Sequence, residues 1–249
     1  PGISVCEVNE NGQIKADPGT VRRDGYRASG ANTPPSGPKN GTYDGYGRHL
    51  ATFRVGSAHI HPKTKEHIES PMDFQEKNRV SFYDFHRLTM GLHYPEHAVL
   101  NLPKVDLRGL IYGPWLDRLK TVMATYPKFS QNPRFEGYSE TRFKSLLPGL
   151  RHAGLNDSQI YYSSKGGKAY GFHIDNAFIA FGDKAGTLDG RGRPTGELKR
   201  AVIVTMGLHV NGDGIINNNI YEHGRISVPF FKAMGYALGQ YLTGEASLR

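Results

Sequence analysis

The pattern of apolar and polar positions predicts β-strands mainly in the second half of the chain. Apolar residues alternate with polar ones, or form short β-branched and aromatic runs, over 159–163, 169–181 and 200–210. Such patterns are typical of strands in a sheet that is covered on at least one face. Segments 49–61 and 80–88 carry weaker versions of the same pattern, and we expect strands there too.

A tight turn is predicted directly after the last of these strands. Residues 211–214 read Asn-Gly-Asp-Gly, and Asn-Gly and Asp-Gly are the dipeptides that favour two-residue hairpin turns. We therefore expect the strand at 200–210 to form a hairpin with a strand at 215–221.

Three segments repeat their apolar residues every three or four positions and are predicted to be helices. The clearest begins with Pro114, which suits a first helical turn, and is stopped by Pro127. A shorter helix is expected at 139–147. A final helix is expected after Ser227, a residue that can cap a helix, with Pro229 in its first turn.

These elements define the fold class that we expect. Gly235 and Gly239 in the final helix would let another backbone approach closely. No internal repeat of 20–50 residues is visible, so a solenoid or propeller is not expected. The sequence predicts an α+β fold: an antiparallel β-sheet core with two or three helices and an extended N-terminal arm.

The arm differs in composition from the rest of the chain. Residues 1–50 contain nine glycines and five prolines among scattered apolar residues, and such a segment cannot build a core of its own. We assign residues 1–48 to the arm and 49–249 to a single α+β domain. An arm of this kind is ordered when it is held by its domain or by a neighbouring subunit, and we expect it to dock on a neighbour in a homo-oligomer.

Charge and cysteine content narrow the class of protein. Lys and Arg outnumber Asp and Glu by 31 to 23, a net charge of +8 that favours an anionic partner such as nucleic acid. Cys6 is the single cysteine, which excludes internal disulfides and disfavours cysteine-ligated zinc. No apolar run reaches about 18 residues and no secretion signal is visible at the start. We expect no membrane contact and an intracellular (cytoplasmic) location or one within a virus particle.

One short motif carries the ligand types of a metal site. His173 and Asp175 are two apart on a predicted strand and therefore project from one face, and His223 follows fifty residues later. Two histidines and one carboxylate form the triad that binds Fe(II) in oxygenases. The segment around His173-Ile174-Asp175-Asn176 resembles the Fe(II)/2-oxoglutarate oxygenases of the prolyl-hydroxylase type. The resemblance implies Fe(II) and 2-oxoglutarate as cofactors, although Arg225 follows His223 too soon to match that family's arginine for the co-substrate.

Another short motif suggests contact with phosphates. Residues 189–194 contain an Arg-Gly-Arg-Pro segment of the kind that enters the minor groove of A·T-rich DNA. The surrounding region has a positive balance of charge. The candidate nucleic-acid-binding residues are Lys184, Arg191, Arg193, Lys199 and Arg200.

The remaining motifs favour no particular enzyme. His59 and His61, with His67 nearby, form a same-face pair that also occurs in metal-dependent nucleases, but Pro62 ends the strand. The chain has no Gly-x-Ser-x-Gly nucleophile elbow and no phosphate-binding glycine loop.

Two hypotheses about function follow. The first is a structural or assembly protein of a basic, nucleic-acid-associated particle, capsid-like or nucleoprotein-like, which accounts for the arm, the charge and the abundant tyrosines that suit interfaces. The alternative is an oxygenase that uses His173, Asp175 and His223. We favour the assembly protein, without a catalytic site.

Overall fold

The central element of the fold is a four-stranded antiparallel sheet. The computed structural model describes residues 2–8, 54–74, 82–94, 114–124 and 144–245. The strand order is β1-β8-β7-β6, with antiparallel pairing throughout. The strands are β1 (Gly2–Val8), β6 (Ile160–Ala169), β7 (Phe172–Phe181) and β8 (Arg200–His209). The three strands predicted at 159–163, 169–181 and 200–210 are thus confirmed.

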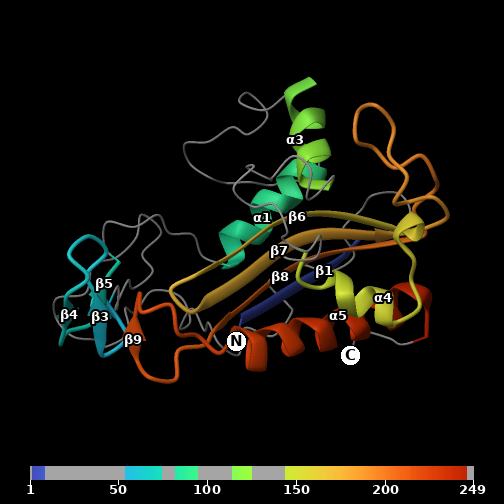
Figure 1. Cartoon of the computed structure of the whole chain (residues 1–249). Coiled ribbons are helices and arrows are strands. Elements are labelled where there is room, and N and C mark those ends of the chain that lie inside the picture. Colours follow the sequence, from blue (N-terminus) through green and yellow to red (C-terminus); the bar gives the residue numbers. More distant parts are fainter. Residues whose placement is uncertain (1, 9–53, 75–81, 95–113, 125–143, 246–249) are drawn as a thin grey trace, which may run out of the picture.

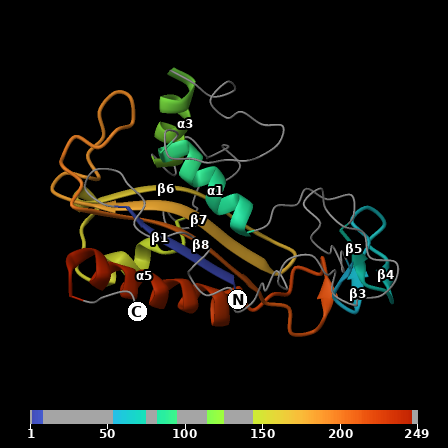
Figure 2. The same cartoon turned by 180° about the vertical axis from the view of Figure 1, so that it is seen from behind.

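Helices cover both faces of this sheet (Figures 1 and 2). Helices α4 and α5 pack on one face, and α1 and α3 lie on the other, with α1 contacting β7 and β8 and α3 contacting β6. Their bounds are α1 (Phe82–His93), α3 (Pro114–Ala124), α4 (Leu147–His152) and α5 (Val228–Thr243). In the described part of the chain, no helix is long and apolar enough to cross a membrane.

Two small sheets lie at one end of the central sheet, on the left of Figure 1. One pairs β2 with β5, and the other has the order β4-β3-β9. These strands are β2 (Arg54–Val55), β3 (Ala58–Ile60), β4 (His67–Ile68), β5 (Met72–Asp73) and β9 (Ile215–Ile216). A short 3-10 helix, Asp157–Gln159, precedes β6, and a π-helical turn, His223–Ser227, precedes α5.

Strand β7 divides the core into two layers. Ala177 and Ile179 belong to the apolar cluster with α4 and α5. Phe178 and Ala180 belong to the cluster on the opposite face, beside α1. The two-residue period of a strand explains this division, because successive side chains point to opposite faces.

The predicted close approach at the glycines of the final helix is confirmed. A Cβ on Gly235 would lie 2.1 Å from the carbonyl oxygen of Leu146, and one on Gly239 would lie 2.5 Å from Cβ of Ala153. Gly149 of α4 faces α5 in the same way, since a Cβ on it would lie 2.0 Å from the carbonyl oxygen of Lys232. The two helices therefore pack backbone against backbone.

The prediction of a strand at 80–88 was wrong, because its described part, from Phe82 onward, belongs to helix α1. Its aromatic residues suggested a strand, but its buried polar side chains, His86 and Thr89, are three residues apart and both face the sheet. Contacts with β7 and β8 thus decide the conformation, as tertiary context often does over local propensity.

The predicted hairpin between 200–210 and 215–221 was also wrong. Strand β9 pairs in parallel with β3, with His59 opposite Ile216, and the chain after β8 leaves the central sheet. Gly214 redirects it, since its carbonyl oxygen accepts a hydrogen bond from the amide of Ser57 at 2.8 Å. Turn residues alone do not determine which strand the following strand pairs with.

The helix expected at 139–147 begins only at Leu147, with Pro148 in its first turn. Residues 139–143 lie outside the described part. The predicted helix from Pro114 is confirmed as α3, although Pro127 is also outside the described residues. The α+β class with an antiparallel sheet is confirmed.

Candidate functional site

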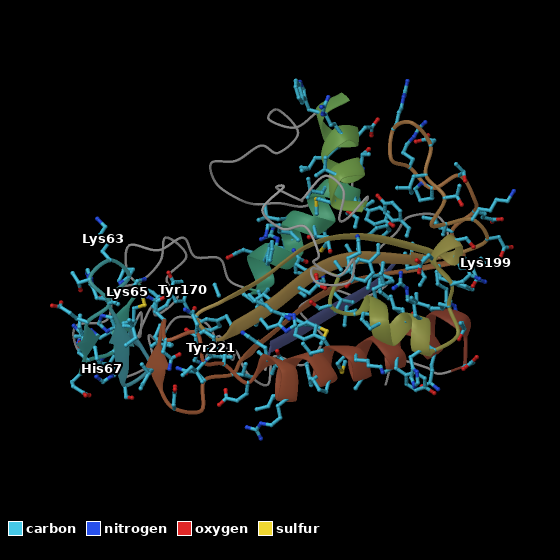
Figure 3. The ribbon with its side chains drawn as sticks, in the orientation of Figure 1. Lys63, Lys65, His67, Tyr170, Lys199 and Tyr221 are labelled. Atoms are coloured by element: carbon cyan, nitrogen blue, oxygen red, sulfur yellow. The ribbon has the colours of Figure 1, made fainter. Side chains whose placement is uncertain are left out.

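The structure places the five predicted phosphate-contacting residues at one end of the central sheet. The segment between β7 and β8 carries four of them, Arg200 is the first residue of β8, and all five are exposed. Figure 3 labels Lys199 at this end. A Cβ on Gly192 would lie 2.0 Å from Thr121 Oγ1 of α3, so Gly192 packs against that helix while Arg191 and Arg193 on either side face solvent.

Three of the five cations already have partners within the chain. Arg193 pairs with Asp189 at 2.9 Å, and Lys199 pairs with Asp183 at 2.9 Å. Arg200 donates a hydrogen bond of 2.6 Å to the carbonyl oxygen of Tyr241, near the end of α5.

Lys184 and Arg191 are the two cations left to contact a ligand. They form no ion pair with the described residues. Asp189 also accepts from the backbone amides of Arg191 and Arg193, which fixes the turn and holds the pKa of Asp189 below its usual range.

His173 and Asp175 project from one face of β7, as their spacing predicted. Both contact Ser145, which lies just before α4. Ser145 Oγ lies 2.7 Å from His173 Nε2, and the amide of Ser145 donates to Asp175 Oδ2 at 2.8 Å. The two side chains thereby hold the same serine by its hydroxyl and by its backbone.

The second nitrogen of His173 is also occupied. Nδ1 lies 2.8 Å from Ser227 Oγ, and that oxygen lies 3.0 Å from Nδ1 of His223. Burial, reinforced by the charges of Lys168 and His223, lowers the pKa of His173 to about 3. Ser227 precedes α5 as predicted but makes no side-chain capping bond, because its hydroxyl serves the two histidines.

This geometry does not form the metal triad of the oxygenase hypothesis. His173 and His223 approach each other edge to face, with ring centroids 5.8 Å apart, and share a serine hydroxyl. Among the described residues, no three His, Cys, Asp or Glu side chains are grouped to hold a metal ion. The Asp175 carboxylate is directed to Ser145 and Tyr162 instead.

Asp175 is the centre of a buried polar cluster. The Tyr162 hydroxyl donates to its Oδ2 at 2.7 Å, while its Oδ1 has no hydrogen-bond partner among the described residues. Burial raises the pKa of Asp175 to about 6, an effect that the hydrogen bond from Tyr162 partly offsets. An orphaned buried oxygen of this kind costs free energy, and no local motif marks Tyr162 as the partner of Asp175.

Lys144 lies beside this cluster and is also buried. Its ammonium donates to the carbonyl oxygens of Tyr162 and Met123, the latter at 3.2 Å. Burial lowers its pKa to about 8, although the charge of Asp175 acts in the opposite direction. Lys144 therefore joins α3 to β6 through backbone acceptors.

A second buried polar network lies on the opposite face of the sheet. The amide of Asn176 donates to Thr89 Oγ1 at 2.6 Å and to the carbonyl oxygen of Phe85, and its Oδ1 accepts from Thr205 at 2.8 Å. His86 Nδ1 completes the network, 3.2 Å from Thr205 Oγ1. The network fixes α1 to β7 and β8.

The histidines near β3 make separate local contacts. His59 Nδ1 lies 2.7 Å from the carbonyl oxygen of Ser70, and His61 Nδ1 accepts from the amide of Thr64. His67 pairs with Glu69 at 3.2 Å. The His61 bond stabilises the turn between β3 and β4, and the His59 bond connects β3 to the segment after β4.

Comparison with known proteins does not extend these observations. No family model, curated protein or solved structure matches this chain.

Proposed function

We propose that this chain is an assembly protein of a basic, nucleic-acid-associated particle, in which the N-terminal arm of one subunit docks on a neighbour. The observation that carries the proposal is strand β1. All seven of its residues pair with β8, from Gly2 opposite Gly207 to Val8 opposite Ala201, and complete one edge of the sheet. Without such a strand, β8 would expose a row of unpaired backbone groups.

The distance along the chain makes exchange between subunits feasible. Residues 9–53, a Gly/Pro-rich stretch, separate β1 from the next described strand. Fully extended, 45 residues span up to about 150 Å, more than enough to reach another copy. A strand on so long a connection can fill the same edge in its own subunit or in another, the relationship known as domain swapping.

Trp115 of α3 supports the same proposal. Its side chain is 72% exposed, although tryptophan is among the residues most enriched at the centres of protein interfaces. Helix α3 lies far from the sheet edge that β1 completes (Figure 1), so the two features would serve different contacts of one subunit.

The single native cysteine allows a direct test of strand exchange. Cys6 lies opposite Ile203 in the β1–β8 register, so an Ile203→Cys variant places two cysteines on directly opposed positions. If β1 crosses between subunits, mild oxidation should produce covalent dimers and larger species on non-reducing gels. Reduction should return them to monomers.

Two controls make this result decisive. The Val202→Cys variant, whose partner is Glu7, places its cysteine one position out of register, on the other face of the strand, and should not cross-link. Cys6→Ser combined with Ile203→Cys should not cross-link either. A product that is entirely internally bridged monomer would show that β1 stays in its own subunit and would overturn the exchange.

The nucleic-acid part of the proposal predicts salt-dependent binding. Replacing Lys184 and Arg191 together by Ala should flatten the plot of log affinity against log salt by about 0.9 for each phosphate that the variant no longer neutralises. Lys63 and Lys65 lie at the opposite end of the molecule (Figure 3), so the Lys63→Ala, Lys65→Ala pair is a matched control that should keep the original slope. Binding that is insensitive to salt in the native chain would remove nucleic acid from the proposal.

A further inference from the structure

The strongest unassigned feature is the hydrogen bond between Ser145 and His173. A serine becomes a nucleophile when a base lies within about 2.6–3.2 Å and a third group orients that base. Ser145 Oγ is 2.7 Å from His173 Nε2, and Ser227 Oγ holds the other nitrogen at 2.8 Å. Ser145 is partly exposed, whereas His173 and Ser227 are buried.

The histidine is held in a single orientation. Its ring stacks on Phe231, with centroids 4.1 Å apart and planes 26° from parallel. When Nε2 accepts the Ser145 proton, Nδ1–H donates to Ser227, whose own proton can point to His223 Nδ1 at 3.0 Å. The hydrogen bonds then run in one direction from Ser145 to the half-buried His223.

The backbone before α5 is a second, independent indication that the Ser145–His173 arrangement is functional. Residues His223–Ser227 form a π-helical turn, in which His223 Nδ1 and Ser227 Oγ lie 3.0 Å apart. Such turns are rare and occur frequently at functional sites. Here the turn directs both residues toward His173.

A second serine–histidine pair shows that residue types alone do not create this arrangement. Ser163 Oγ lies 3.1 Å from His93 Nε2, but Ser163 is fully buried and no substrate can reach it. The Ser145 pair differs from it in accessibility and in the additional oriented groups.

We infer that Ser145 is a catalytic nucleophile for acyl transfer from carboxylic esters, with His173 as its base and Ser227 as a positioning residue. The Ser145 hydroxyl proton passes to His173 Nε2 as Oγ attacks the ester carbonyl carbon. The carbon–oxygen bond to the leaving group breaks, and the departing alkoxide takes the proton from His173 as an alcohol. Water then cleaves the acyl-serine, which yields the carboxylic acid and regenerates Ser145.

The third group favours esters over amides. Burial lowers the pKa of His173 to about 3, and a hydroxyl at Nδ1 stabilises the imidazolium less than the carboxylate of a Ser-His-Asp triad does. Forming the His173 imidazolium, which must protonate the leaving group, is therefore less favourable. Aryl esters have leaving groups that depart with little protonation, so aryl esters are the appropriate substrates. This activity goes beyond the assembly function and does not depend on it.

The experiment treats the full chain with a fluorophosphonate probe and with p-nitrophenyl acetate. We expect the probe to modify Ser145, as located by mass spectrometry of peptides, and the Ser145→Ala variant to lose both labelling and ester turnover. His173→Gln should slow labelling by about 100-fold, the typical loss of a general base. The matched control, Ser163→Ala, should be labelled as the native protein is.

The Ser227→Ala variant tests whether Ser227 positions His173 for catalysis or only stabilises the fold. A positioning role predicts a lower maximal rate of inactivation with unchanged probe affinity, in a variant whose circular dichroism is native. A folded native chain that is not labelled, or is labelled at another serine, would overturn the inference. So would a folded His173→Gln variant that reacts at the native rate. Should that variant not fold, the position of the label in the native chain still decides the question.

Discussion

Acidification from pH 7 to pH 5 is expected to destabilise this protein strongly, because two histidines are buried in the neutral form. Burial lowers the pKa of His86 to about 4 and that of His173 to about 3. In the unfolded chain both bind a proton near pH 6.5, whereas in the folded chain they do not. Their stabilising effect is complete above pH 6.5 and is lost as the pH falls below it.

Asp175 acts in the opposite direction over part of this range. Its folded pKa of about 6 lies above the unfolded value, so the folded state holds an extra proton between about pH 6 and pH 4. At pH 5 each histidine should lower the free energy of unfolding by about 2 kcal/mol, and Asp175 should raise it by about 1 kcal/mol. The net decrease in the free energy of unfolding is roughly 3 kcal/mol. A third histidine, His93, whose pKa is also lowered to about 3 by burial and by Lys120, adds to the loss.

Urea unfolding followed by circular dichroism at several pH values between 7.5 and 5 measures this dependence. His86→Gln and His173→Gln should each be less stable at pH 7 but should each reduce the slope of stability against pH by about one proton. The exposed His67→Gln variant is the matched control and should keep the full slope. A stability that stays constant from pH 7 to pH 5 would contradict the buried neutral histidines.

The sequence predicted the sheet because its signals there are local. The patterns at 159–163, 169–181 and 200–210 reflect strands that are buried on both faces, and the pleat fixes which side chains share a face. This is why the joint orientation of His173 and Asp175 could be foreseen. The aromatic residues of 80–88 suggested a strand, and that prediction was wrong. Helix α1 forms there because of its contacts with β7 and β8, which are distant in sequence.

The candidate site could be predicted only in part. His173, Asp175 and His223 carried a recognisable spacing, but the metal hypothesis lacked the information that two serines occupy both nitrogens of His173. Ser145 lies 28 residues and Ser227 lies 54 residues from that histidine. Neither belongs to a local motif, and only the packing of α4 and α5 on the sheet brings them to His173.

The sequence also could not predict which cations of residues 184–200 are paired within the chain. The sequence identifies five cations as candidate contacts for phosphate, and the structure shows that all five are exposed. It also pairs Arg193, Lys199 and Arg200 with acceptors of the same chain. A count of charges cannot reveal this, because Asp183 lies 16 residues from Lys199 and Tyr241 lies 41 residues from Arg200.

The contact between α4 and α5 predicts that a single methyl group added to α5 at Gly235 is strongly destabilising. Gly235→Ala would normally favour a helix by about 1 kcal/mol. Here the new Cβ would lie 2.1 Å from the carbonyl oxygen of Leu146 and 3.1 Å from Cα of Gly149. Because the obstacles are backbone atoms, no side-chain rotation can relieve the overlap, and the helices must separate.

We expect Gly235→Ala to lower the free energy of unfolding by roughly 3 kcal/mol, at the upper end of typical overpacking costs. The separation would also shift α4 and with it Ser145, so ester turnover should fall together with stability. Gly167→Ala in β6 is the matched control, since its Cβ would meet nothing within 4 Å and stability should change little. Ala233→Gly, at an exposed position of α5, should cost about 1 kcal/mol from helix propensity alone. Urea unfolding of the three variants measures the effect, and a Gly235→Ala protein as stable as the native chain would show that the two helices do not pack backbone to backbone.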